Sequence, residues 1–269
     1  MIVVEIVFLG TGGGRFNLVK QIRRTGGFRI NGSLNIHVDP GPGALFSSIH
    51  FKQDASDVDL LILTHNHIDH TNDAGLMVEA FSKYKKKHGF AIGSKSVIEG
   101  DANRDRGISR YHLRNLEKYW IAVPGKKMEI RMRGRKITLL PTRVRHDDRT
   151  GFGFVLEMGG KKIGYTSDTE YYWGMAAQYS GCDVLIANCL KPKKDNVPGH
   201  LDSASTARLL SEAKPALAVL THFGMSMLAA GPEKEAVRIG KISGVRTVSA
   251  KDGMKIKMTA ETPRADRKA

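Results

Sequence analysis

The stretch VDLLILTHNHIDH, residues 58–70, decides how this chain folds and what chemistry it can perform. Its first part, residues 58–63, is an apolar run with the length of a buried strand. Directly after this run come four side chains that bind metals, namely His65, His67, Asp69 and His70. Imidazole and carboxylate groups suit zinc and its neighbours, and a loop that leaves a strand can turn such groups towards one centre. The stretch therefore predicts a metal site at the end of a strand, rather than a polar loop that happens to be rich in histidine.

The composition of the chain is that of a globular protein. It has 269 residues, of which 41% are hydrophobic, and only two cysteines. A disordered chain would be poorer in aliphatic residues, and a disulfide scaffold would be richer in cysteine. The length fits one large α/β domain or two small ones. We expect a single domain over residues 1–260, followed by a mobile basic tail over residues 261–269.

The opening residues and the cysteines bear on where the protein resides. The apolar run MIVVEIVFLG, residues 1–10, contains Glu5 and is far shorter than the roughly 20 residues that cross a bilayer. It also lacks the basic start and the small-residue cleavage site of an export signal. Cys182 and Cys189 lie near an expected buried strand, which suits a reducing compartment. We therefore expect a cytoplasmic protein that does not enter the membrane.

Positive charge is concentrated in the middle of the chain. The net charge is +15, and residues 81–149 alone carry 19 basic and 7 acidic groups, a balance of +12. Such a field attracts polyanions, so RNA or DNA is an expected partner of this segment. A solvated basic surface is the alternative. The oligomeric state is left open, with a homodimer as one alternative.

Strands and helices alternate along the chain, which predicts an α/β fold. Thr64-His65 and Thr221-His222 each follow an expected strand, which suggests two similar halves. Helices are expected over residues 72–87, from about residue 171, and over 203–213 and 233–242. Strands are expected over residues 3–9, 27–30, 34–39, 58–63, 128–133, 136–140, 152–157, 162–165, 184–187, 217–220, 245–248 and 254–257.

The metal-binding stretch resembles the H-x-H-x-D-H motif of the metallo-β-lactamase superfamily, in which a later His, Asp and His follow. Here His146, Asp168 and His222 fill those positions in order. FLGTGGG at residues 8–14 and HVDPG at residues 37–41 also resemble the first two strands of that family. The resemblance implies a four-layer αβ/βα sandwich that binds two divalent metal ions, with zinc expected and manganese as the alternative.

The resemblance also implies a role for each residue. Asp39 would accept a hydrogen bond from one ligand and so orient it. Taken alone, His146 is an ordinary loop histidine and Asp168 could be a helix N-cap, so their order and spacing carry the assignment. The implied ligands are His65, His67 and His146 for the first metal and Asp69, His70 and His222 for the second, with Asp168 bridging the two.

Within the superfamily the chain is most similar to ribonuclease Z and its phosphodiesterase relatives. The segment GHLDS, residues 199–203, lies between Asp168 and His222, where that branch has a histidine that serves the scissile phosphate. The resemblance therefore implies that His200 and Asp69 are catalytic. The alternative for His200 is a loop histidine before a helix capped by Asp202 or Ser203. We expect a hydrolase of phosphodiester bonds in nucleic acid or in cyclic or small nucleotides.

Two departures from ribonuclease Z weaken the most specific assignment. Only 22 residues lead from His146 to Asp168, too few for the long arm that holds tRNA, and Asn188 stands where the family has a supporting Glu. A ribonuclease Z-type tRNA 3′ endonuclease is therefore an alternative, as is a thioester or lactone hydrolase of the same superfamily. A nucleic-acid-binding protein with a structural metal site is the remaining alternative, although such sites usually close with four ligands.

Overall fold

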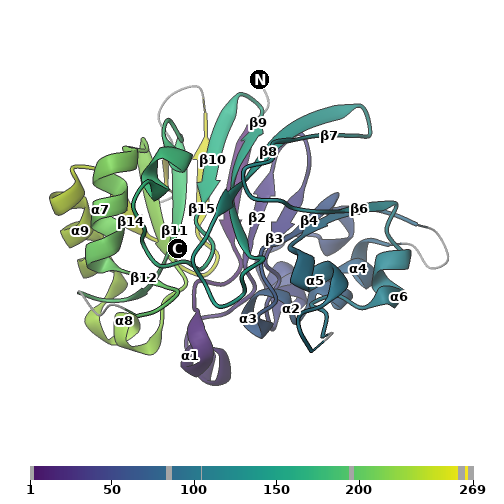
Figure 1. The fold of residues 1–269 in the computed structure, drawn as a ribbon, viewed down its shortest axis with the longest axis horizontal. Helices are drawn as coiled ribbons and strands as arrows, with labels where there is room; N and C mark the ends of the chain where they lie inside the picture. Colours follow the sequence, from purple (N-terminus) through teal and green to yellow (C-terminus); the bar gives the residue numbers. More distant parts are fainter. Residues whose placement is uncertain (1–2, 83–86, 104, 194–196, 260–263, 266–269) are drawn as a thin grey trace.

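Two β-sheets packed face to face form the centre of the molecule, as Figure 1 shows for the computed structural model. The structure describes residues 3–82, 87–103, 105–193, 197–259 and 264–265. Helices cover the outer face of each sheet, so that the layers follow the order helix, sheet, sheet, helix (Figure 1). This is the four-layer α/β sandwich that the sequence predicts.

The first sheet contains most of the strands from the first half of the chain. Its order is β16-β15-β1-β2-β3-β4-β5-β6 among the described residues. The pairs from β15 to β3 are antiparallel, and those from β3 to β6 are parallel. Its strands are β1 (Val4–Phe8), β2 (Phe28–Asn31), β3 (Ile36–Val38), β4 (Leu60–Leu63), β5 (Phe90–Gly93), β6 (Lys118–Ile121), β15 (Lys255–Met258) and β16 (Arg264–Ala265).

The second sheet follows the order β14-β13-β11-β10-β9-β8-β7, and β12 pairs with β11 beside this path. The pairs from β7 to β10 are antiparallel, and those from β10 to β14 are parallel. Its strands are β7 (Met128–Met132), β8 (Arg135–Arg143), β9 (Phe152–Met158), β10 (Lys161–Tyr165), β11 (Val184–Lys191), β12 (Leu201–Asp202), β13 (Leu217–Thr221) and β14 (Thr247–Ser249).

The two sheets repeat one pairing scheme. Starting from β15 in the first sheet and β7 in the second, three antiparallel pairs are followed by three parallel pairs. The scheme supports two similar halves. The repeated Thr-His pair is not part of it, because β4 is the fifth strand of its series whereas β13 is the sixth.

Helices pack on the outer faces because both sheets are apolar on both sides. β4, with the sequence LLIL, is buried along its whole length between the inter-sheet core and the helices, which explains its unbroken apolar run. The helices are α1 (Gly14–Lys20), α2 (Ala44–His50), η1 (Ala55–Asp57), α3 (Ile68–Thr71), α4 (Ala74–Phe81), α5 (Lys95–Glu99), α6 (Arg110–Arg114), η2 (Met175–Tyr179), α7 (Ser203–Ala213), α8 (Met225–Ala230) and α9 (Pro232–Ser243).

Two expected helices differ from the structure. The one expected over 72–87 is α4, which ends at Phe81 because Ser82 is extended, and residues 83–86 lie outside the described residues. The helix expected from residue 171 is wrong. Tyr171 and Tyr172 instead turn their hydroxyls to the Glu212 carboxylate and the Arg143 carbonyl, and only the short 3₁₀ helix η2 follows, from residue 175.

Two features of the described residues concern the C-terminal tail and the membrane. Of the expected tail, residues 261–269, only Arg264–Ala265 lie within the described residues, where their backbone pairs with β15. Within the described part of the chain, none of the helices combines the length and the apolar character that a membrane crossing requires.

Candidate metal centre

The centre lies where carboxyl ends of parallel strands from both sheets meet. β3 leads into Asp39, β4 into His65, β10 into Asp168 and β13 into His222. This edge is where open α/β sheets place their ligands, because the loops that leave neighbouring parallel strands converge there. Asp39 and His222 both adopt a positive φ, of 50° and 62°. The structure thus holds functional side chains in a conformation that L-residues rarely adopt.

All seven predicted ligands converge at this edge. They fall into groups whose potential ligand atoms lie within 4.8 Å of one another. Asp168 shares such a group with His65 and His70, which places it between the other two. Those two groups are His65, His67 and His146, and Asp69, His70 and His222, the same sets that the resemblance implies.

The donor atoms are arranged as metal ligands would be. His70 Nε2 lies 3.1 Å from His222 Nε2, and His146 Nε2 lies 3.2 Å from His67 Nδ1. The buried Nε2 of His65 has no hydrogen-bond partner among the described residues. A buried polar atom without a partner costs free energy, whereas a cation would satisfy all of these lone pairs together. The residues present therefore fit divalent metal ions.

Asp168 lies close to several of the ring nitrogens in the centre. Its Oδ2 lies 3.3 Å from His222 Nε2 and 3.5 Å from His70 Nε2. Burial raises the pKa of this carboxyl group, but the two neighbouring rings outweigh burial and hold the pKa well below its usual range. Burial lowers the pKa of His65 well below its ordinary value. Asp168 thus favours its ionised form and His65 its neutral form, which are the metal-binding forms of these two groups.

In three of the histidines, the ring nitrogen that faces away from the centre has a hydrogen-bond partner. His70 Nδ1 lies 3.0 Å from the Asp39 carboxylate, so the predicted orienting contact of Asp39 is present. His146 Nδ1 lies 2.9 Å from the Gly199 carbonyl, and His65 Nδ1 lies 3.1 Å from the Thr64 hydroxyl. Such contacts fix the tautomer and the orientation of each ring.

The sequence interpretation missed Asp147. Its Oδ2 lies 3.3 Å from His67 Nε2, and its Oδ1 lies 2.9 Å from His146 Nε2. The next residue, Asp148, turns away and accepts hydrogen bonds from the backbone of Asn66 and the hydroxyl of Ser96. Both aspartates follow His146 directly, and nothing in the sequence distinguishes the one that faces the centre.

His200 also lies at the centre. Its Nδ1 is 3.5 Å from Asp168 Oδ2, and its ring is stacked on that of His222 at an interplanar angle of 18°. Burial lowers the pKa of His200 to about 4. The ring is positioned by the start of α7, where Asp202 is the N-cap and accepts a hydrogen bond from Ser205 N–H.

Asn188, in β11, contacts Asp168 and not His200. Its Nδ2 donates to Asp168 Oδ1 across 2.7 Å and lies 3.1 Å from the Tyr165 hydroxyl. The same hydroxyl donates to Asp39. Asn188 thus connects the central carboxylate with the group that orients His70.

The glycine-rich opening closes one side of the centre. The Gly14 N–H donates to Asp69 Oδ2 across 3.1 Å. A Cβ atom on Gly13 would lie 2.2 Å from the His222 ring, a distance that no side chain tolerates. The stretch GTGGG therefore allows the backbone to approach two of the predicted ligands closely.

The centre opens into a groove. A cavity of about 670 Å³ lies over it, lined by His67, Arg145, Arg149 and His200 among others. A neighbouring cavity of about 530 Å³ shares His67 and Arg149 and continues towards Lys95 and α5. A substrate larger than a single phosphate can therefore reach the ligands from this side.

Comparison with known proteins agrees with this geometry. The beta-lactamase superfamily domain matches residues 34–223. An uncharacterized protein of Methanocaldococcus jannaschii is 36% identical over 95% of both chains. A metal-dependent hydrolase of Staphylococcus epidermidis is 27% identical over 69% of this chain and 78% of its own length.

Similar folds occur in solved structures. The metallo-beta-lactamase fold protein YhfI from Bacillus subtilis has a TM-score of 0.76 at 20% identity, over 96% of this chain and all of its own. A diphosphatase of the PhnP family reaches 0.69 at 15% identity, over 96% and 98%. The short form of human tRNase Z reaches 0.67 at 16% identity, over 94% and 98%. The family match, the fold and the His and Asp cluster together identify the chain as a member of the metallo-β-lactamase superfamily and a metal-dependent hydrolase.

Proposed function

We propose that this chain is a binuclear metal-dependent phosphodiesterase. The observation that carries the proposal is the position of His200, whose Nδ1 lies 3.5 Å from Asp168 Oδ2. His200 shares a candidate ligand group with His146 and Asp168, but it lies outside the two groups that would each hold one ion. A titratable ring at that place is free to act on the substrate. The names of a diphosphatase and a tRNase among proteins of similar fold support chemistry at phosphorus.

The seven converging residues support two ions. His65, His67 and His146 would hold one ion, Asp69, His70 and His222 the other, and Asp168 both. The histidine-rich set favours zinc, with manganese as the alternative. When bound, such ions draw charge from phosphate oxygens and make water acidic near neutral pH.

Two side chains have proposed roles in the reaction itself. Asp69, held through its Oδ2 by Gly14 N–H, can accept a hydrogen bond from an attacking water. His200 would protonate the leaving oxygen once the negative charge of a bound phosphodiester has raised the pKa of its ring from about 4. Arg145 and Arg149 line the cavity over the centre and supply positive charge for the phosphate. The proposed substrates are nucleic acid and small or cyclic nucleotide phosphodiesters.

The ribonuclease Z-type tRNA 3′ endonuclease is the second candidate. Between His146 and Asp168 the chain forms β9 and β10, which are paired in the second sheet. This use of the interval favours a small or flexible phosphodiester over folded tRNA.

The buried free thiols of Cys182 and Cys189 support a reducing, cytoplasmic location.

Metal analysis combined with a substrate panel tests the proposal. The panel holds bis(p-nitrophenyl) phosphate, cyclic nucleotides, RNA, DNA, tRNA precursor, a thioester and a lactone. We expect about two ions per chain and turnover of phosphodiesters that chelation abolishes. Asp168→Ala should abolish turnover, whereas Glu233→Ala, at an exposed residue of α9 outside the ligand groups, should not. One ion in a fully active preparation would refute the binuclear centre, and turnover of the thioester or lactone alone would refute the phosphodiesterase.

A further inference from the structure

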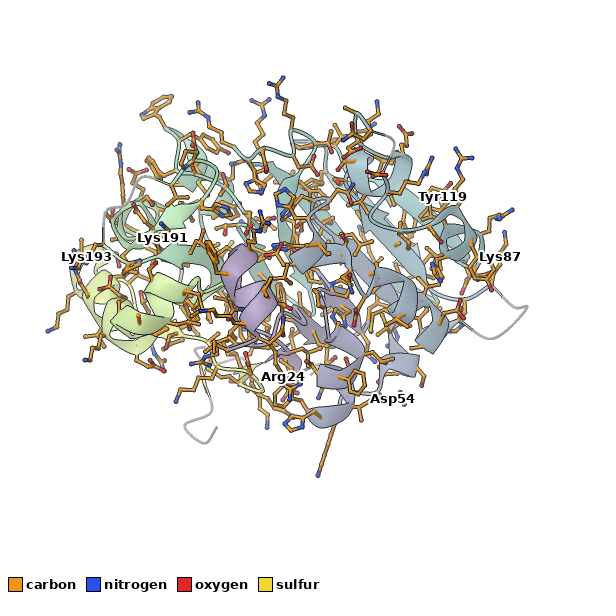
Figure 2. All side chains as sticks on the ribbon, turned by 90° about the horizontal axis from the view of Figure 1, so that it is seen from below. Arg24, Asp54, Lys87, Tyr119, Lys191 and Lys193 are labelled. Carbon is orange, nitrogen blue, oxygen red and sulfur yellow. The ribbon has the colours of Figure 1, made fainter. Side chains whose placement is uncertain are left out.

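A second large cavity lies on the helical side of the first sheet and shares no lining residue with the cavities at the metal centre. Its volume is about 840 Å³, and it lies between α5, α6 and the edge strand β6. Lys87 and Tyr119, which line it, lie at the end of the molecule opposite Lys191 and Lys193 (Figure 2). We call this cavity the basic groove, after the five cationic residues that line it, namely Lys87, Arg106, Arg110, Arg114 and Lys118.

The cations of the basic groove are not neutralised by the protein. Within the described ranges, none of the five has a carboxylate oxygen within 4.0 Å. The two acidic residues of the groove pair with cations outside it. Glu99 lies 3.9 Å from Lys95, and Glu117 lies 3.4 Å from Arg133. The groove therefore offers uncompensated positive charge.

Other cations of the basic segment are engaged elsewhere. In the hairpin of β7 and β8, Arg133 lies 2.6 Å from Asp59, Lys136 lies 2.9 Å from Glu129, and Arg135 donates to the Ser33 carbonyl. Much of the positive charge of the hairpin therefore has partners within the protein itself. The groove gathers five of the described cations of residues 81–149 that have no carboxylate oxygen within 4.0 Å, and five others, Lys126, Lys127, Arg131, Arg143 and Arg149, do not line it.

We propose that the basic groove binds the backbone of single-stranded RNA. This inference rests on the proposed function and deepens it, because it names the polymer that carries the phosphodiester. Uncompensated lysine and arginine side chains attract phosphates through release of counterions. Tyr119, which is 45% exposed, offers a ring on which a base can stack.

The acidic residues of the groove favour RNA over DNA. The carboxylates of Glu99 and Glu117 would repel a phosphate, but each can accept a hydrogen bond from a ribose 2′-hydroxyl. Deoxyribose lacks this donor. The groove thus combines cations for the phosphates with two carboxylates for ribose hydroxyls.

The groove is close enough to the centre to feed it. On the far side of α5 lies the cavity lined by Asn66, His67 and Lys95. α5 lines both cavities, through Ile98 and Glu99 in the basic groove and through Lys95 and Ser96 in the other, so the width of one short helix, about 10 to 12 Å, separates them. The Asn66 amide also donates to the Asp105 carbonyl, which ties the loop after α5 to the metal-binding stretch. A strand in the groove can therefore continue to the metal ligands.

Fluorescence anisotropy tests the groove. The probe is a labelled single-stranded RNA of about 12 nucleotides, and the full chain carries Asp168→Ala so that the probe stays intact. The groove variant combines Arg110→Glu, Arg114→Glu and Lys118→Glu. We expect its Kd to rise at least about tenfold near 0.1 M salt. The negative slope of the log association constant against the log salt concentration should become shallower by about 2. DNA of the same sequence should bind several-fold more weakly.

A matched control separates the groove from net charge. Lys234→Glu, Lys241→Glu and Lys257→Glu make the same charge change on α9 and β15, and these residues do not line the groove. Equal weakening by both triple variants, no weakening by the groove variant, or equal affinity for DNA would overturn the inference. A milder triple, Arg110→Gln, Arg114→Gln and Lys118→Gln, guards against misfolding and should show a smaller effect in the same direction.

Activity on a small ester distinguishes the two proposals. In the chain with Asp168 intact, the groove variant should hydrolyse bis(p-nitrophenyl) phosphate with unchanged kcat/KM, since that ester is too small to reach the groove. Absence of any phosphodiester turnover together with groove-dependent RNA binding would refute the proposed function and leave the groove assignment standing. Turnover of the small ester without groove-dependent RNA binding would do the reverse.

Discussion

Asn188 Nδ2 donates a hydrogen bond to Asp168 Oδ1 across 2.7 Å, and so occupies one of the two oxygens of the central carboxylate. The other oxygen, Oδ2, is the one that faces His70 and His222. Asp168 is thereby presented to both ligand groups through a single atom. We therefore expect Asn188 to act as a positioning residue, with an effect exerted through Asp168.

Replacing Asn188 with Ala should weaken metal binding. Without the amide, Asp168 can rotate, and loss of such a supporting group typically costs 10- to 100-fold in metal affinity. Competition with a chromophoric chelator measures the affinity. The control is Asn35→Ala, at a residue whose amide donates to the Asp57 carbonyl away from the centre. Unchanged metal affinity in Asn188→Ala would show that the carboxylate holds its position without help.

Asp147 should matter most for the ion held by His67 and His146. Its carboxylate lies 3.3 Å from His67 Nε2, where it favours the tautomer whose Nδ1 lone pair faces the centre. We expect Asp147→Ala to lower affinity for one of two ions by about tenfold, and Asp147→Asn to have a smaller effect. Metal titration followed by elemental analysis reports the stoichiometry, with Glu233→Gln as the exposed control. Equal loss of both ions would contradict this selective role.

His200→Ala should slow substrates with a poor leaving group more than activated ones. If His200 protonates the leaving oxygen, its loss costs roughly 10²- to 10⁴-fold on an alkoxide. A nitrophenolate needs little protonation and should be affected much less. The ratio of kcat values on the two classes is the measurement, and metal content should stay at the wild-type level. Equal losses on both leaving groups would exclude the acid role.

His37 should make the fold sensitive to mild acid. Its buried ring lies 2.9 Å from the Gly26 carbonyl, and burial, together with Arg29, lowers its pKa from 6.5 to about 3. The unfolded chain binds a proton near pH 6.5, while the folded chain does not until about pH 3. The stability due to the neutral ring is therefore complete above pH 6.5 and is lost progressively as the pH falls towards 3.

His37→Gln removes this titration and keeps a donor for the carbonyl. Between pH 7 and pH 5, the free energy of unfolding of the wild type should fall by about 2 kcal/mol more than that of the variant. Urea denaturation with chelator present measures the difference, because the other histidines then titrate alike in both proteins. His50→Gln, at an exposed residue, should behave like the wild type. Parallel pH curves for His37→Gln and wild type would contradict the assignment.

The sequence predicted the strands, and which His and Asp side chains lie together, better than it predicted the helices, for physical reasons. Strands such as β4 are buried on both faces, so their apolar runs are unbroken in the sequence. Short helices such as α5 and α6, of five residues each, depend on tertiary contacts and carry little periodicity of their own. They were not predicted, although the basic groove is built on them.

Residues of the centre could be predicted where they form a motif of fixed spacing. They could not be predicted where only the folded loop shows which side chain turns towards the centre. His65, His67, Asp69 and His70 occupy a compact motif, whereas Asp147 and Asp148 are indistinguishable until the loop is folded. The partner of Asn188 was also unpredictable, because its amide reaches Asp168 from a neighbouring strand. A sequence records such a contact only as two distant polar residues.

The position of β15 constrains the order of events during synthesis. This strand pairs with β1, and Asp252, shortly before it, accepts hydrogen bonds from the N–H groups of Thr11 and Arg24 on either side of α1. While a nascent chain has not yet released β15 from the ribosome, β1 presents an unpaired edge. The glycine-rich stretch that packs on His222 then also lacks its hydrogen bond to Asp252. The backbone of the glycine-rich stretch beside His222 therefore gains these supporting contacts only after translation has passed β15.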